Sequence, residues 1–146
     1  NIILTLSKKL RTILKDKLII LSERADIATI AKLDGIHVGN RSLPVDILKK
    51  KFNHLTIGYS AHGIEEIKEI EADYFTLSPI FFTKKEHPVN PIGVVDVSKL
   101  NKKIYALGGI NKENILNLLN KGYKGVAGIS FLKDLPHIRK LICSAN

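Results

Sequence analysis

The sequence predicts an α/β protein built around a parallel sheet. Short apolar runs that are typical of buried strands alternate along the chain with segments whose apolar residues recur at helical spacing. Such an alternation requires right-handed crossovers and gives either an open sheet or a closed barrel. Every predicted strand is followed by polar residues or glycines, and in both architectures the active site lies at the carboxyl ends of the strands.

The predicted strands and helices alternate along the whole chain. We expect strands at residues 17–22, 35–38, 55–60, 74–78, 104–107 and 125–129. We expect helices at residues 2–14, 25–33, 45–52, 64–72, 94–100, 111–121 and 135–142. In the first helix one face is apolar and carries Ile3, Leu6, Leu10, Ile13 and Leu14.

The longest predicted connection covers residues 81–92. It contains Pro88 and Pro91, and its ionisable residues run from Lys84 to His87, which predicts an exposed, mobile loop that can act as a lid. Lys84 and Lys85 either close over an anionic ligand or form a solvated charge run.

Composition and charge are those of an ordinary folded domain. The 146 residues are 45% hydrophobic and 25% charged, which suits a single domain over residues 1–146 with a continuous core. The net charge of +9 is compatible with an anionic partner. The basic residues are scattered, however, and aromatic residues do not interleave with them, which argues against nucleic acid.

Several features that the sequence lacks bear on where the protein is found in the cell and on where its gene product begins. No stretch approaches the length of a membrane span and no signal peptide opens the chain, so we expect a cytoplasmic protein with no membrane partner. The single cysteine, Cys143, excludes an internal disulfide and fits a reducing compartment. Because the chain contains no Met and opens on Asn1, we expect the gene product to begin upstream.

Two strand ends near the C-terminus predict a phosphate site. The strand at 104–107 is followed by Gly108 and Gly109, and the strand at 125–129 is followed by Ser130. Glycines at one strand end and a serine at the next expose backbone N–H groups that can bind a phosphate without a charged side chain. The alternative is a pair of tight turns with no ligand, since a short glycine motif is weak evidence.

Five motifs in sequence resemble the thiamine phosphate synthase/TenI family. They are DGIHVG (34–39), GYSAH (58–62), ADY to SPIFFT (72–83), ALGGI (106–110) and GVAGIS (125–130), and their order and spacing match from about residue 17 to 132. The resemblance implies a TIM-type (β/α)8 barrel of which this chain carries strands three to eight. An incomplete barrel of this kind leaves two unpaired edges, so we expect an N-terminal extension or a homodimer.

The resemblance implies that the metal-binding half of the site is altered. Synthases of the family join a pyrimidine methyl diphosphate to a thiazole phosphate with the help of Mg²⁺ and release pyrophosphate. Where the synthase pattern has Asn-Asp-Arg, this chain has Ser22, Glu23 and Arg24, and Ser42 stands where a second metal carboxylate belongs. Glu23 is therefore the candidate metal ligand. Arg24 is either a phosphate or carboxylate ligand or a surface residue.

The thiazole-phosphate half is better preserved. Gly108, Gly109, Ile129 and Ser130 match the family's phosphate cradle. The altered loop after residue 83 keeps Thr83 as a further substrate ligand.

Ser60 and His62 match the family's Ser-x-His motif. In TenI-type proteins the His of this motif is the proposed acid/base for isomerising a thiazole carboxylate phosphate, and imidazole suits that task because it titrates near neutrality. The alternative is that His62 caps the following helix. His37, which alternates with buried strand residues, is expected to be structural or to line the mouth of the site.

Three functions follow from these residues. The favoured one is a TenI-like thiazole tautomerase that uses His62 and needs no cofactor. The second is a thiamine phosphate synthase that needs Mg²⁺, and the third is a non-catalytic module that binds or senses thiazole phosphate. The partner in all three is a small phosphorylated thiazole.

Overall fold

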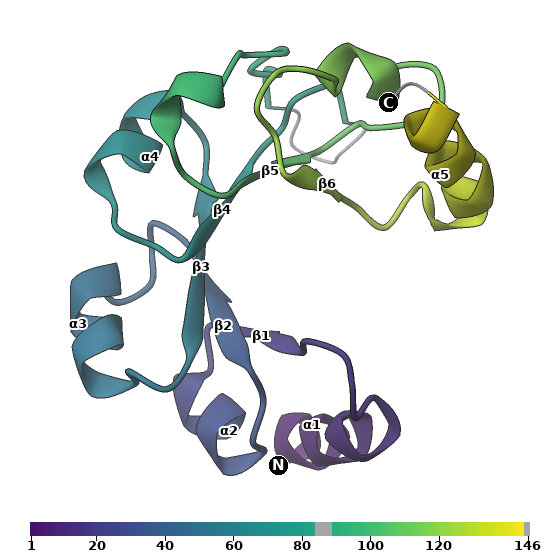
Figure 1. Ribbon diagram of the computed structural model, residues 1–146. Coiled ribbons are helices and arrows are strands. Elements are labelled where there is room, and N and C mark those ends of the chain that lie inside the picture. Colours follow the sequence, from purple (N-terminus) through teal and green to yellow (C-terminus); the bar gives the residue numbers. More distant parts are fainter. Residues whose placement is uncertain (84–88, 145–146) are drawn as a thin grey trace. The chain divides into compact units, whose positions relative to one another are not determined.

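The computed structural model describes residues 1–83 and 89–144, and this part of the chain falls into two compact units (Figure 1). The first unit comprises Asn1–Ser60 and Ile70–Asp73, and the second comprises Ala61–Glu69 and Tyr74–Asn146. The strands within each unit are parallel. The predicted α/β class is thereby confirmed.

The first unit carries three strands in chain order. Leu21 of β1 lies opposite Ile36 of β2, and Ile36 lies opposite Ile57 of β3. Ile36 and Ile57 are fully buried, as expected of parallel strands covered on both faces. The elements are α1 (Ile2–Ile13), β1 (Ile20–Ser22), α2 (Ala25–Ile30), β2 (Gly35–Val38), α3 (Val45–Lys51) and β3 (Thr56–Ala61), the last residue of which belongs to the second unit.

Two aspartates of the first unit make the same backbone contacts. The Asp34 carboxylate accepts the N–H of Ile19 at 2.7 Å, and the Asp73 carboxylate accepts the N–H of Ile57 at 2.7 Å. In each case the aspartate N–H donates to the carbonyl of the same partner residue. Arg11 of α1 also forms an ion pair with Asp34. This contact attaches the helix to the loop before β2.

The apolar face predicted for α1 is exposed. The helix itself is confirmed, but its buried residue is Ser7, at 3% exposure, while Leu6 is 53% and Ile13 is 75% exposed. The amphipathic pattern therefore identified a helix correctly without identifying the face that packs within this chain.

The second unit carries the other three strands, also in chain order. Leu77 of β4 lies opposite Ala106 of β5, which lies opposite Val126 of β6. Its core contains Phe75, Ile104 and other fully buried side chains. The elements are α4 (Ile64–Glu69), β4 (Tyr74–Leu77), η1 (Ser98–Leu100), β5 (Ile104–Leu107), η2 (Ile115–Leu118), β6 (Gly125–Ala127), η3 (Leu132–Asp134) and α5 (Leu135–Ser144).

The helix predicted at 94–100 is wrong except for its last turn. Only the 3₁₀ turn η1 forms, because the Asp96 carboxylate accepts both the backbone N–H of Ser98, at 2.9 Å, and its hydroxyl, at 2.6 Å. Aspartate side chains that bind nearby N–H groups compete with helix formation. The β-branched residues before Ser98 add to the effect.

The helix predicted at 111–121 is also wrong, because the segment forms only the 3₁₀ turn η2. Its backbone bonds span three residues, as from Asn117 to Asn114 and from Leu119 to Leu116. Ile115 and Leu118, three residues apart, supply the buried side chains. This is the spacing at which 3₁₀ side chains align. The apolar pattern read as helical therefore fits the tighter turn equally well.

Residues 84–88 of the expected lid lie outside the described residues, and so do Lys84 and Lys85. In the part of the chain that the structure describes, every helix is too short or too polar to traverse a bilayer.

Candidate functional site

The turn after β5 has its carbonyl groups occupied by neighbouring donors. The carbonyl of Leu107 accepts the N–H of Ile80 at 2.9 Å, and that of Gly108 accepts the N–H of Phe81 at 3.1 Å. The next carbonyl, of Gly109, accepts a hydrogen bond from the Asn114 side-chain amide at 2.9 Å. Each of these carbonyl oxygens carries a partial negative charge, and its hydrogen bond keeps it directed at the donor. The turn can therefore offer N–H groups to an anion.

Glycine is required at both turn positions. Gly108 has a φ of +95° and Gly109 a φ of +66°, conformations that residues with a side chain rarely adopt. A Cβ on Gly108 would lie 2.8 Å from the Cα of Pro79, and one on Gly109 would lie 2.4 Å from the carbonyl oxygen of Phe82. The two glycines thus let the turn pack against the segment that follows β4.

A pocket of about 400 Å³ lies beside this turn. It brings together three of the predicted ligands, Thr83, Gly109 and Ser130. Its remaining walls are Phe82, Ile110, Asn111, Phe131 and Asp134. Its described lining contains one aspartate and no lysine or arginine, so an anion bound there would have to be held by backbone N–H groups and hydroxyls. Phosphate held by N–H groups in such a turn has the chemistry of an anion-binding nest.

Thr83 carries a buried hydroxyl, Oγ1, that makes no hydrogen bond within the described part of the chain. A buried hydroxyl without a partner costs about 1–3 kcal/mol, and most such groups in native proteins are satisfied by solvent or ligand. The Thr83 hydroxyl therefore fits a ligand oxygen in the pocket.

The strand-end residues of β6 are arranged differently from one another. Ser130 is exposed and lines the pocket, whereas the Ile129 side chain is 85% exposed and does not. Behind them a Cβ on Gly128 would lie 2.6 Å from the Phe131 ring, so this glycine allows the ring to pack closely. A contribution of Ile129 to phosphate binding would have to come from its backbone.

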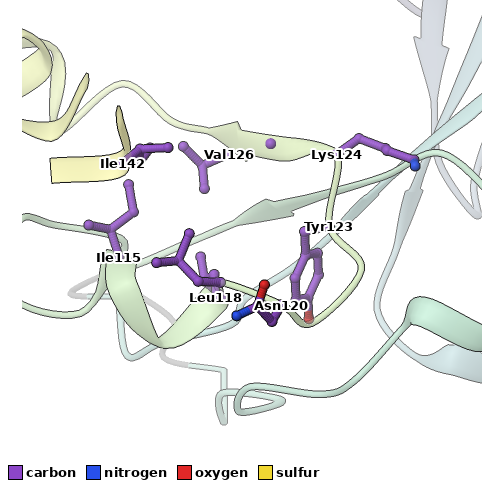
Figure 2. Close-up of a pocket in the computed structure, with 9 residues that line it drawn as sticks. Ile115, Leu118, Asn120, Tyr123, Lys124, Val126 and Ile142 are labelled. Atoms are coloured by element: carbon purple, nitrogen blue, oxygen red, sulfur yellow. The ribbon is translucent and has the colours of Figure 1, made fainter. Parts of the chain in front are cut away.

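A second pocket of the same unit has a different character. It measures about 280 Å³ and is largely apolar, with Ile115, Leu118, Val126 and Ile142 among its walls (Figure 2). Figure 2 shows the Lys124 side chain extending away from Val126 and Ile142. Asn120, Tyr123 and Lys124 also line this pocket, but none of the residues predicted to bind phosphate does.

His62 has a defined ring orientation. Its Nδ1 lies 2.8 Å from the carbonyl oxygen of Ser78, and a carbonyl can only accept, so Nδ1 carries the proton. In the neutral ring Nε2 is then the acceptor, as a general base requires. The side chain is exposed. Its backbone N–H donates to the Glu66 carboxylate at 3.4 Å, and the imidazole takes no part in this contact.

Ser60 and His37 belong to the first unit, and both are half-buried strand residues. Burial lowers the pKa of His37, which favours its neutral form.

Glu23 and Ser42 meet in the first unit. The Ser42 hydroxyl donates to the Glu23 carboxylate at 2.9 Å and accepts the N–H of Gly39 at 3.0 Å. Two hard oxygen atoms from two strand ends are thereby held side by side. No cluster of three or more metal-binding side chains occurs among residues 1–83 and 89–144.

Arg24 is already paired. Its Nε and Nη2 donate to the two carboxylate oxygens of Asp26 at 2.8 and 2.5 Å. The hydrogen bond from Arg24 lowers the pKa of Asp26 to about 2. This pair uses two of the five guanidinium N–H groups, so Arg24 can still donate to a phosphate, and both the ligand role and the surface role stay predictions.

Sequence reasoning did not single out Asn114 or Asp134. Asn114 follows Asn111 by three residues, and the two exchange hydrogen bonds between side chain and backbone. That spacing of two polar capping residues was the available signal. The position of Asp134 in the pocket wall carries no sequence signal, because it depends on the turn after β6.

The alignments with known relatives cover most of this chain. A protein of Aquifex aeolicus, whose name refers to thiamine-phosphate synthase, is 37% identical over 134 residues, which cover 86% of this chain and 72% of the relative. The thiamine-phosphate synthase of Prochlorococcus marinus is 36% identical over 75% of this chain and 34% of its own length. The chain thus spans about a third to about three quarters of these relatives.

Solved structures show the same similarity. The thiamine phosphate pyrophosphorylase of Pyrococcus furiosus matches with a TM-score of 0.77 and 29% identity, over 94% of this chain and 70% of that protein. The chain also matches, over residues 3–132, the family described as thiamine monophosphate synthase. The resemblance noted from the five motifs is therefore confirmed: the chain belongs to the thiamine monophosphate synthase family.

Proposed function

We propose that this chain acts as a thiamine phosphate synthase and contains the thiazole-phosphate site of that reaction. The names of its relatives favour the synthase over the tautomerase that the altered metal residues suggested. The pocket beside Gly109 is the observation that carries the proposal. It combines a turn whose carbonyls are occupied, an exposed serine, and a buried hydroxyl that has no partner in residues 1–83 and 89–144.

In this proposal the phosphate of the thiazole substrate enters that pocket. Its oxygens accept hydrogen bonds from turn N–H groups and from the hydroxyls of Thr83 and Ser130. Asp134, in the pocket wall, repels any phosphate there, and it repels the more highly charged diphosphate more strongly than a monoester. A monoester phosphate on a neutral ring therefore suits the pocket better than a diphosphate.

The oxygen pair of the first unit fits Mg²⁺. This ion prefers oxygen ligands and is held in many proteins by one or two carboxylates, with water and substrate phosphate completing the shell. Glu23 would provide the carboxylate and Ser42 a hydroxyl oxygen. When bound, Mg²⁺ would neutralise charge on the diphosphate that leaves. A site with one carboxylate should hold the ion more weakly than a site with two.

His62 would contact the thiazole substrate through Nε2, the ring atom opposite the bond to Ser78. In the coupling reaction the methylene carbon loses pyrophosphate and gains a bond to the thiazole nitrogen. The His62 imidazole does not need to transfer a proton in this substitution at the methylene carbon. His62 is accordingly proposed to orient the thiazole, and proton transfer by His62 is kept for the tautomerase alternative.

The test is an assay of the purified 146-residue chain with pyrimidine methyl diphosphate, thiazole phosphate and Mg²⁺. The synthase predicts Mg²⁺-dependent release of pyrophosphate together with formation of thiamine phosphate. Isomerisation of thiazole carboxylate phosphate that is lost in His62→Ala, without pyrophosphate release, would establish the tautomerase instead. Thiazole phosphate binding without either reaction would leave the chain as a binding module.

A further inference from the structure

Asn114 holds the turn after β5 through both atoms of its side-chain amide. The Oδ1 atom accepts the N–H of Asn111 at 2.9 Å, and the Nδ2 atom donates to the carbonyl of Gly109 at 2.9 Å. Because a backbone N–H must meet the oxygen and a carbonyl must meet the nitrogen, the two partners fix the orientation of the amide.

The same residue is itself held by the turn. The backbone N–H of Asn114 donates to the Asn111 side chain at 3.1 Å, and the N–H of Glu113 donates to the same oxygen at 2.8 Å. This reciprocal arrangement resembles a capping box, in which two polar residues satisfy each other's backbone groups. It ties the glycine turn to the start of the segment that contains η2.

Asn114 does not line the pocket, whereas Gly109, Ile110 and Asn111 do. In a trans peptide the carbonyl and the following N–H point in opposite directions. With the Gly109 carbonyl turned to Asn114, the Ile110 N–H points away from Asn114. If the carbonyl were released, the flexible glycine could rotate it toward the anion and replace attraction with repulsion.

We infer that Asn114 is a positioning residue of the phosphate site, which sets the affinity for phosphate by keeping the Gly109 carbonyl out of the pocket. The inference rests on the proposed function, because it takes the pocket beside Gly109 as the thiazole-phosphate site. Asn117 provides a matched control. It lies three residues further on, its side chain is exposed, and it lies outside the pocket wall.

The experiment measures binding of thiazole phosphate and of inorganic phosphate to the 146-residue chain by calorimetry. Asn114→Ala should weaken both about tenfold, the equivalent of one buried hydrogen bond, while Asn117→Ala should stay within about twofold. Asn114→Asp keeps an oxygen for the Asn111 N–H but places a carboxylate against the Gly109 carbonyl. It should lose more affinity than Asn117→Asp, which adds the same charge nearby.

The outcomes separate the inference from the proposed function. A wild-type chain that binds neither probe would overturn the proposed function, and the inference with it. A wild-type chain that binds both, with Asn114 variants that bind equally well, would overturn the positioning role alone. A loss for thiazole phosphate without a loss for inorganic phosphate would also overturn it, since the turn acts on the phosphate. If circular dichroism shows that Asn114→Ala is unfolded, the positioning role is tested with Asn114→Asp and Asn117→Asp instead. Equal affinities of these two variants for phosphate would overturn the role.

Discussion

Gly109→Ala should distort the turn after β5 and, under the proposed function, should also block phosphate binding there. The alanine would have to adopt a φ of +66°, which costs a residue with a side chain about 1–2 kcal/mol. Its Cβ would also lie 2.4 Å from the Phe82 carbonyl oxygen and 2.8 Å from the Phe81 carbonyl carbon. Both are backbone atoms, so relief requires the chain to move, at roughly 1–3 kcal/mol for an overpacked site.

Together these costs amount to about 2–5 kcal/mol. For a chain of this size they correspond to a fall in melting temperature of roughly 6–15 °C. Thermal unfolding followed by circular dichroism measures the change. Gly63→Ala is the matched control in the same unit, because a Cβ added at Gly63 would have no neighbouring atom within 4 Å and the φ of this residue is not positive. It should shift the melting temperature by no more than about 2 °C.

Phosphate binding gives a second readout for the same pair of variants. Gly109→Ala should abolish calorimetric binding of thiazole phosphate at a temperature where the variant is still folded, and Gly63→Ala should preserve it. A Gly109→Ala protein that melts within about 2 °C of the wild type would refute the conformational argument. One that is destabilised but binds normally would show that the turn is structural and lies outside the ligand site.

Three further predictions concern other parts of the molecule. Thr83→Val should leave the unliganded chain equally stable or about 1 kcal/mol more stable, since it removes a buried hydroxyl without a partner among the described residues, and it should weaken phosphate binding in calorimetry. Ser42→Asp should increase the Mg²⁺-induced rise in melting temperature by adding a second carboxylate, yet should lower stability without Mg²⁺ because it faces Glu23. The N–H of Ile19 holds the pKa of Asp34 below its ordinary value, so the stabilisation from Asp34 is present above pH about 4 and is lost as pH falls through the folded-state pKa. Urea titrations at several pH values should therefore show a smaller acid-induced loss in Asp34→Asn than in the wild type.

The strands were predictable because burial dictates their composition. Ile36, Ile57 and Ile104 are fully buried, and buried parallel strands are written as continuous apolar runs. The strands at 35–38 and 104–107 were predicted to the residue. The turn at Gly108 and Gly109 was predictable for a related reason. A pair of glycines at a strand end indicates a backbone conformation that residues with a side chain rarely adopt.

The contacts between side chains and backbone were not predictable in the same way. Asp96 and Asn114 each turn an apparently helical segment into a shorter one by binding backbone groups nearby. Hydrophobic periodicity does not register such bonds, because polar residues count only as gaps in the apolar pattern. The same limit applies to the pairing of Arg24 with Asp26, two residues away on an exposed surface.

Glu23 bears on the choice between synthase and tautomerase. It is a non-glycine residue with a φ of +62°, a conformation that costs about 1–2 kcal/mol. Glycine would avoid that cost at this position, but it would remove the carboxylate that receives the Ser42 hydroxyl. Strained residues of this kind persist mainly where the surrounding structure and the function require them. The same conformation occurs at Lys32, Asn101 and Asn120, so the backbone alone does not mark a site. What distinguishes Glu23 is the hydrogen bond that its carboxylate receives from the Ser42 hydroxyl. In the proposed synthase this pair would hold Mg²⁺, whereas a tautomerase without a metal would have no need for the carboxylate.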